Sequence, residues 1–217
     1  MSDIVDEVEE ELRAERAKKL LQRYGSLIIG AAVAIVAVVA GFQAWRWYEA
    51  RERTRVAAIY ISAMHQADAQ AAADHQAALA GLAKVSAEGM PGYTTLARLR
   101  AAALKADAGD KEGALRLWDD VAKDGSADPL LRDLANLQWA MHQVDTGDPA
   151  QVTARLKPLT DPNNAWHAMA EEQLALLALR QGQTQAAHDT LKRLANDVTA
   201  PQGVRGRAGG LLAKLGG

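Results

Sequence analysis

The residues that could carry chemistry are few and widely spaced in this chain of 217 residues. Cysteine is absent, which excludes thiolate catalysis and metal sites built from cysteine. The histidines lie far apart, at His65, His75, His142, His167 and His188. His167 and Glu171 are spaced i, i+4 and so share a helical face, but a zinc site needs further ligands. We interpret the pair as a surface histidine beside a carboxylate, and we expect no metal site.

Motifs of nucleotide binding and nucleophilic catalysis are also missing from the sequence. The glycines from Gly203 onward lack the preceding strand and the Lys-Ser/Thr ending of a phosphate-binding loop. No serine lies in a G-x-S-x-G elbow. The net charge of −2 gives no indication of a nucleic-acid partner. We therefore expect no catalytic residues, no cofactor and no small-molecule substrate, and we do not expect an enzyme.

One uncharged stretch, residues 24–45, dominates the N-terminal part of the chain. It reads YGSLIIGAAVAIVAVVAGFQAW, and as a helix it would be about 33 Å long, enough to cross a hydrocarbon core of about 30 Å. Tyr24 stands at one end and Trp45, Trp47 and Tyr48 at the other, where aromatic rings prefer the headgroup level. The pattern predicts a single transmembrane helix. Seven acidic residues in the preceding segment favour an uncleaved signal anchor over a signal peptide, although Ala40 and Gly41 leave cleavage as an alternative.

Small residues form one face of this predicted span. Gly30, Ala34, Ala37 and Gly41 fall at i, i+4, i+7 and i+11, which would let another helix approach closely. Glycine and alanine are also common in any membrane helix. These small residues thus either form a packing surface for a partner helix or only reflect the usual composition of a membrane helix.

The charged residues that flank the span decide its orientation only weakly. Five Lys or Arg residues precede it and four follow it closely. In residues 1–23, Ile4, Val8 and Leu12 recur every four positions, which predicts an amphipathic helical tail. A short tail inside and a large exported domain is the ordinary product of an N-terminal signal anchor. We therefore predict a cytoplasmic N-terminus.

After the span the sequence repeats with a period of 35–38 residues. Gly109, Gly147 and Gly182 mark equivalent turns, and apolar residues stand at five fixed offsets from each of them. These columns are Ala97, Ala135, Ala170; Ala102, Ala140, Ala175; Ala114, Val152, Ala187; Trp118, Leu156, Leu191; and Val121, Leu159, Leu194. Such a period predicts an all-α solenoid of stacked helical hairpins, whereas a plain bundle with evenly spaced loops is the alternative.

Two further segments complete the predicted solenoid. Ala78, Leu82, Val85 and Pro91 fit the second half of an earlier unit, but its first half, around residues 59–64, fits poorly. Residues 204–215 predict a short closing helix, weakened by its glycines.

The concave face of such a stack is a second candidate binding surface. Its positions, taken by register, are Leu99, Leu137 and Glu172, then Ala103, Met141 and Leu176, then Ala106, Val144 and Leu179. This face is more apolar than a solvated groove should be. Either it receives hydrophobic segments of a client or partner, or neighbouring helices of the same domain fill it.

The columns resemble the tetratricopeptide repeat. The chain keeps the small residue of the first helix (Ala102, Ala140, Ala175) and the bulky residue of the second (Trp118, Leu156, Leu191). It departs at the second small position, which holds Val121, Leu159 and Leu194, and its prolines have no fixed offset. The resemblance is therefore to degenerate tetratricopeptide-like repeats.

The whole chain is similar to the YfgM-type ancillary subunits of the SecYEG translocon. The matching segments are KKLLQRYGSLIIGAA, GFQAWRWYEARERTRVAAIYISA and YTTLARLRAAALKADAGDKEGAL. The resemblance implies a bacterial inner-membrane protein with a cytoplasmic tail (1–23), a transmembrane helix (24–45) and a periplasmic repeat domain (46–217). It implies translocon subunits, periplasmic chaperones and exported clients as partners. An envelope-assembly or cell-division scaffold is the alternative function.

Overall fold

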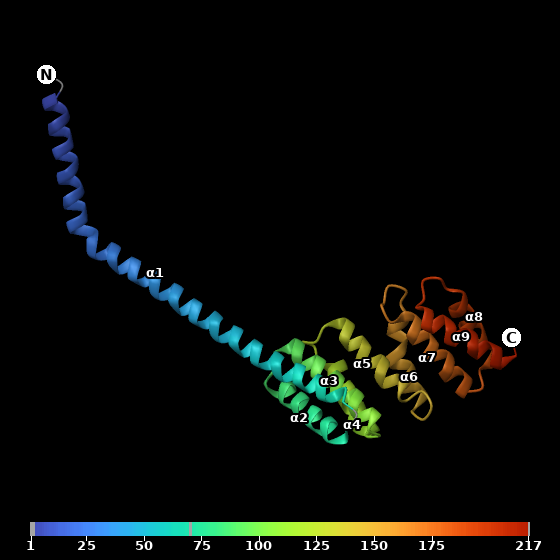
Figure 1. The fold of residues 1–217 in the computed structure, drawn as a ribbon. Coiled ribbons are helices and arrows are strands. Elements are labelled where there is room, and N and C mark those ends of the chain that lie inside the picture. The colour runs from blue at the N-terminus through green and yellow to red at the C-terminus, as the bar shows by residue number, and fades with distance from the viewer. Residues whose placement is uncertain (1–2, 70, 217) are drawn as a thin grey trace. The chain divides into compact units, whose positions relative to one another are not determined.

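The computed structural model describes residues 3–69 and 71–216, and every element within them is helical (Figure 1). They divide into two units, Met1–Thr54 and Arg55–Gly217. The prediction of an all-α chain is confirmed for these residues. Of the side chains in residues 3–23, only that of Lys18 is described. The predicted apolar face of Ile4, Val8 and Leu12 thus lies outside the described residues.

The first helix, α1, runs from Asp3 to Ala67. Within Tyr24–Ala67 its most apolar window has a mean hydropathy of 2.4 and contains no buried residue. By length and composition, this helix can cross a membrane. The compact second unit begins at Arg55, whereas the sequence prediction began the repeat domain at residue 46. Residues 46–54 contain no buried side chain, so nothing in them belongs to the core.

The second unit consists of helical hairpins that follow one another along the chain. Its helices are α2 (Ala72–Glu88), α3 (Pro91–Asp107), α4 (Lys111–Lys123), α5 (Pro129–Met141), α6 (Pro149–Leu156), the 3₁₀ helix η1 (Lys157–Thr160), α7 (His167–Arg180), α8 (Thr184–Asn196) and α9 (Gln202–Leu215). The pairs are α3 with α4, α5 with α6, and α7 with α8, and α9 packs on α8 at the end of the series.

Prolines and aspartates start several of these helices. Proline is the first residue of α3, α5 and α6, where the missing N–H has no helical partner to lose. The N-cap side chain of Asp128 accepts a hydrogen bond from the Leu130 N–H at 2.8 Å, and Asp110 accepts one from the Gly113 N–H at 2.9 Å. Pro158 has the opposite effect. It cannot donate a helical hydrogen bond, and α6 passes into η1 there, so Leu159 lies in η1.

The three register glycines occupy turns for two different reasons. Gly109 and Gly182 have φ of +84° and +75°, a left-handed conformation that side chains disfavour. Gly147 has no positive φ. Instead, a Cβ at position 147 would lie 2.8 Å from the backbone carbonyl oxygen of Gln143, so close approach disfavours any larger residue.

All fifteen residues of the five predicted columns are at most 2% exposed. They do not meet in one shared core. Four hydrophobic clusters follow one another, each at the contact between adjacent helices of the series. This arrangement confirms stacked hairpins and not a plain bundle, because each cluster is completed only by the next hairpin.

The first half of the earliest hairpin is the C-terminal part of α1. Val56, Ala63 and Ala67 are buried in one cluster with Leu82 and Val85 of α2. A Cβ on Gly81 would lie 3.0 Å from the Ala63 Cβ, so α1 and α2 approach closely there. The sequence prediction sought this half around residues 59–64, but its buried positions begin earlier and end later.

Candidate functional site

None of the nine predicted groove residues is fully exposed. Leu137, Val144 and Glu172 are buried, and the other six are half-buried. Leu137 and Val144 belong to the cluster between α5 and α7, because α6 and α7 close over them. Leu99 and Ala106 pack against the cluster around Trp118, and Leu179 packs against the last cluster. For these positions the structure shows internal packing.

Three of the predicted residues nevertheless line an open groove of about 500 Å³ between α5, α7 and α9. We call it the α5–α7–α9 groove. Its lining comprises Met141, Glu172, Gln173, Leu176, Arg207, Gly210, Leu211 and Lys214. The α9 residues were missed by the sequence analysis, which treated this segment only as a closing helix. Their spacing of i, i+3, i+4 and i+7 places them on one helical face, and that pattern could have identified them.

A buried carboxylate connects two walls of this groove. Glu172 on α7 is 2% exposed, and it accepts hydrogen bonds at 2.6 Å from both Nε and Nη2 of Arg207 on α9. These hydrogen bonds raise the pKa of Arg207 above its ordinary value. A two-pronged contact of this kind has strict geometry and compensates a charge that would be expensive to bury alone. The pair therefore holds α9 against α7 in one orientation.

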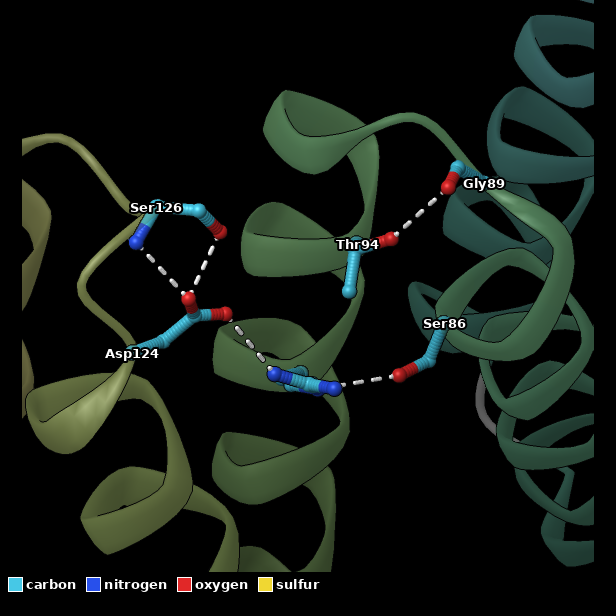
Figure 2. Close-up of polar contacts among 6 residues, drawn as sticks. Ser86, Gly89, Thr94, Asp124 and Ser126 are labelled. Carbon is cyan, nitrogen blue, oxygen red and sulfur yellow. Dashed lines mark hydrogen bonds and ion pairs between the residues drawn. The ribbon is translucent and has the colours of Figure 1, made fainter.

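A second groove, of about 530 Å³, lies along α2, α3 and α4. Arg98 is one of its lining residues and donates to the Ser86 hydroxyl at 3.2 Å and to Asp124 at 3.1 Å. Figure 2 shows Ser126 donating twice to the same Asp124 carboxylate, and these bonds lower the pKa of Asp124. Thr94 donates to the Gly89 carbonyl at 3.2 Å and closes the α2–α3 turn (Figure 2). The polar groups drawn there are occupied with one another and stabilise the hairpins.

Another polar brace joins α4, α5 and α6. Arg155 of α6 donates to Asp119 of α4, and its guanidinium lies 4.1 Å from the ring centroid of Trp139 on α5. Burial of the Asp119 carboxylate raises its pKa, but hydrogen bonds from Lys123 and Arg155 outweigh this effect, so the pKa of Asp119 falls below its ordinary value. This brace stabilises the contact between successive hairpins.

The histidine and carboxylate that the sequence placed on one helical face have other partners. Glu171 accepts a hydrogen bond from Arg193 at 2.7 Å, and the ring of His167 lies 3.1 Å from the Asn164 carbonyl. Among the side chains that the structure describes, no three from His, Asp or Glu form a group that could hold a metal ion. His142 stacks on Trp118 with the ring centroids 4.7 Å apart, and burial lowers its pKa.

The predicted packing face of α1 is exposed along its length. Gly30, Ala34, Ala37 and Gly41 are all exposed in the first unit. A Cβ on Gly30 or Gly41 would meet no atom within 4 Å. The face is therefore open to any helix that packs against it.

Stacked hairpins with buried alanine columns define a helical-repeat protein, a class built to present surfaces to other proteins. The model of the tetratricopeptide repeat-like domain family matches residues 18–192, and the chain belongs to this family. The match includes the apolar part of α1 and ends within α8, so α9 lies beyond it. No curated protein and no solved structure matches the chain. Tetratricopeptide repeat-like domains generally mediate protein–protein interactions, and this chain carries such a module.

Proposed function

We propose that the chain is a membrane-anchored, non-enzymatic interaction protein of the bacterial inner membrane. In this role it assists exported proteins at the SecYEG translocon and passes them to periplasmic chaperones. The observation that carries the proposal is the combination, in one family match, of an apolar helix and a tetratricopeptide repeat-like module. The resemblance of the three quoted segments to translocon ancillary subunits supplies the particular partner.

The exposed apolar surface of α1 supports membrane insertion. Val33, Ile35 and Phe42 are each more than 60% exposed, and residues 24–45 contain no charge. A helix that is apolar on all sides is stable only where a membrane or other protein covers it. At the end of the span, Trp45 and Trp47 are 72% and 63% exposed, as expected for rings at the headgroup level.

Two arginines complete this aromatic flank. Arg46 lies 5.8 Å from the Phe42 ring centroid, and Arg51 lies 5.4 Å from that of Trp47. Such cation–π contacts keep the guanidinium groups next to the rings while the charges stay at the polar boundary. These contacts support a membrane boundary near Trp45. In the proposed arrangement the short tail is cytoplasmic and the repeat module is periplasmic.

The proposal is tested by purifying the full-length chain from membranes in mild detergent and identifying the proteins that accompany it. Translocon subunits should dominate. The double variant Ala34→Leu, Ala37→Leu should insert normally but lose these subunits, because larger side chains prevent close helix packing. The control, Ala32→Leu, adds a leucine on the opposite side of the helix and should retain them.

Other outcomes would contradict parts of this function. Recovery of division or outer-membrane assembly proteins in place of the translocon would favour an envelope scaffold. If the Ala34→Leu, Ala37→Leu variant retained translocon subunits as well as the parent does, the helix would be only a tether and recognition would lie in residues 55–217.

A further inference from the structure

We propose that the C-terminal flank of the apolar span binds the phosphate groups of anionic phospholipids through Arg46 and Arg51. The inference rests on the membrane anchor of the proposed function and deepens it, because it names the class of lipid that surrounds this end of the span. Three features of α1 support this ligand: two arginines without a carboxylate partner, their contacts with exposed aromatic rings, and their positions on different sides of the helix.

Four arginines follow the span closely, and the two that lie farther from it have carboxylate partners. Arg53 forms an ion pair with Glu49 at 2.5 Å, and Arg55 is likewise paired. Among the side chains that the structure describes, none forms an ion pair with Arg46 or Arg51. The two arginines nearest the hydrocarbon therefore keep an uncompensated positive charge.

Aromatic rings hold these two guanidinium groups on the membrane side of their own backbone positions. Arg46 lies 5.8 Å from the ring centroid of Phe42, and Arg51 lies 5.4 Å from that of Trp47. Each ring belongs to the preceding turn, because helical side chains tilt toward the N-terminus of the helix. A charge drawn toward the hydrocarbon is stabilised by a counter-charge at the same depth. Phosphate is the anion that a membrane presents just outside its hydrocarbon core.

The N–H donors of both arginines are also available to an anion. Within the part of the chain that the structure describes, no oxygen accepts a hydrogen bond from either guanidinium group. A guanidinium is planar, and its five donors match the oxygens of a phosphate. Zwitterionic headgroups present this phosphate beside a cation of their own, so two uncompensated arginines favour a lipid with a net negative charge.

The positions of the two arginines around α1 favour lipid over a protein partner. At 3.6 residues per turn, Arg46 and Arg51 are about 140° apart around the helix and about 7.5 Å apart along it. Arg46 lies about 150° from the centre of the small-residue face that runs from Gly30 to Gly41. A single helix packed on that face would not cover both arginines, whereas lipids surround the rest of the span. Each arginine therefore meets a different headgroup.

The experiment uses the full-length chain in vesicles of equimolar phosphatidylcholine and phosphatidylglycerol. In one preparation the acyl chains of phosphatidylglycerol carry bromine near the headgroup, and in the other those of phosphatidylcholine do. Bromine quenches tryptophan on contact, so the ratio of the two quenching values reports which lipid lies next to Trp45 and Trp47. We expect phosphatidylglycerol to be preferred by about twofold to fivefold, because one basic residue near an anionic surface contributes up to about fivefold and other lipids dilute this preference. High salt should weaken it.

The decisive variant combines Arg46→Gln with Arg51→Gln. It should abolish the preference, and each single change should weaken it, because the uncompensated charges are removed. Replacing both residues by lysine should keep most of the preference, since the positive charges remain. The matched control combines Glu49→Gln with Arg53→Gln, which removes a neutralised pair from the same flank and should leave the preference unchanged. All of these variants should resist carbonate extraction and keep the circular dichroism of the parent.

Several results would overturn the inference. They are equal quenching of the parent by the two lipids, an unchanged preference in Arg46→Gln with Arg51→Gln, or a lost preference in the lysine variant or the matched control. If inorganic phosphate removed the preference more effectively than sodium chloride of the same ionic strength, the arginines would bind a soluble anion and the inference would also be wrong.

Failure of the inference and failure of the proposed function give different results. If the parent resists carbonate extraction but shows no lipid preference, the membrane anchor stands and this inference alone is wrong. If carbonate extracts the parent from the vesicles, the anchor and the inference both fail. If phosphatidylglycerol is preferred but no translocon subunit co-purifies, the lipid site stands without that partner.

Discussion

Replacement of Trp118 by alanine should destabilise the repeat unit more than most single substitutions in this chain. Trp118 is 2% exposed and lies in a cluster with Ala102, Ala114, Val121 and Ala135. A buried tryptophan removes about 200 Å² from water, which at about 25 cal/mol per Å² corresponds to about 5 kcal/mol. The alanine side chain would retain part of this free energy of burial. Truncation of a buried aromatic residue to alanine typically costs about 3–5 kcal/mol.

The neighbours of Trp118 place the expected loss in the upper half of that range. Most of its fully buried neighbours are alanines, which have no side-chain freedom with which to fill the cavity, so the site would collapse poorly. The truncation also removes the ring stack with His142, whose interplanar angle is 26°, and such a contact contributes about 0.5–1.5 kcal/mol. We therefore expect a loss of about 4–5 kcal/mol in the free energy of unfolding.

The assay is urea unfolding of a fragment comprising residues 55–217, followed by circular dichroism. Trp118→Phe keeps an aromatic ring and should cost roughly half as much. Val198→Ala is the control, because Val198 is 83% exposed, and it should change the free energy of unfolding by less than about 0.5 kcal/mol. A loss below about 1 kcal/mol for Trp118→Ala, with an unchanged urea slope, would refute the assigned packing between hairpins.

Three further predictions concern charge and topology. Arg207→Ala should destabilise the unit by about 3 kcal/mol, because it leaves the buried Glu172 carboxylate without a partner; replacing both residues by methionine should recover most of this loss in the same urea assay. Asp119 has a lowered pKa, so its contribution to the free energy of unfolding is present above its ordinary pKa and is lost as the pH falls through the folded-state pKa. In Asp119→Asn, the loss of stability below about pH 4 should therefore be smaller than in the parent. An equal loss of stability in the two proteins would contradict this prediction. Cysteines introduced singly at Ser2 and Ser126 should react with an impermeant maleimide on intact spheroplasts only at position 126, and the reverse pattern would exclude a cytoplasmic N-terminus.

The repeat architecture could be predicted because its determinants are local and periodic. A glycine lies in the turn between the two helices of each of these three hairpins, and small or bulky apolar residues recur at the positions that face the next hairpin. Gly109 and Gly182 need a left-handed backbone, which the residue type itself indicates. The burial of Ala102, Trp118 and Val121 follows from the same spacing. A period shared by three units leaves little freedom for another arrangement.

The groove could be predicted only in part, because its exposure depends on how successive hairpins rotate. Register placed Leu137 and Val144 on the same face as Met141, yet neighbouring helices bury the first two and leave Met141 at an opening. Small rotations between repeats decide this difference, and no single position in the sequence encodes them. The first hairpin could also be predicted only in part. Its buried residues on α1, Val56 and Ala63, belong to a helix whose membrane composition obscured the repeat pattern.

By itself the sequence determined the apolar segment 24–45, the hairpin period and the residues of the buried columns, since each depends on neighbours within a few turns of the chain. Only the tertiary structure decided that Glu172 meets Arg207, 35 residues further on. Pairings between distant residues depend on the positions of α7 and α9 relative to each other. Those positions follow from the packing of α5 to α9 on one another, so the α5–α7–α9 groove exists only once these helices are in place.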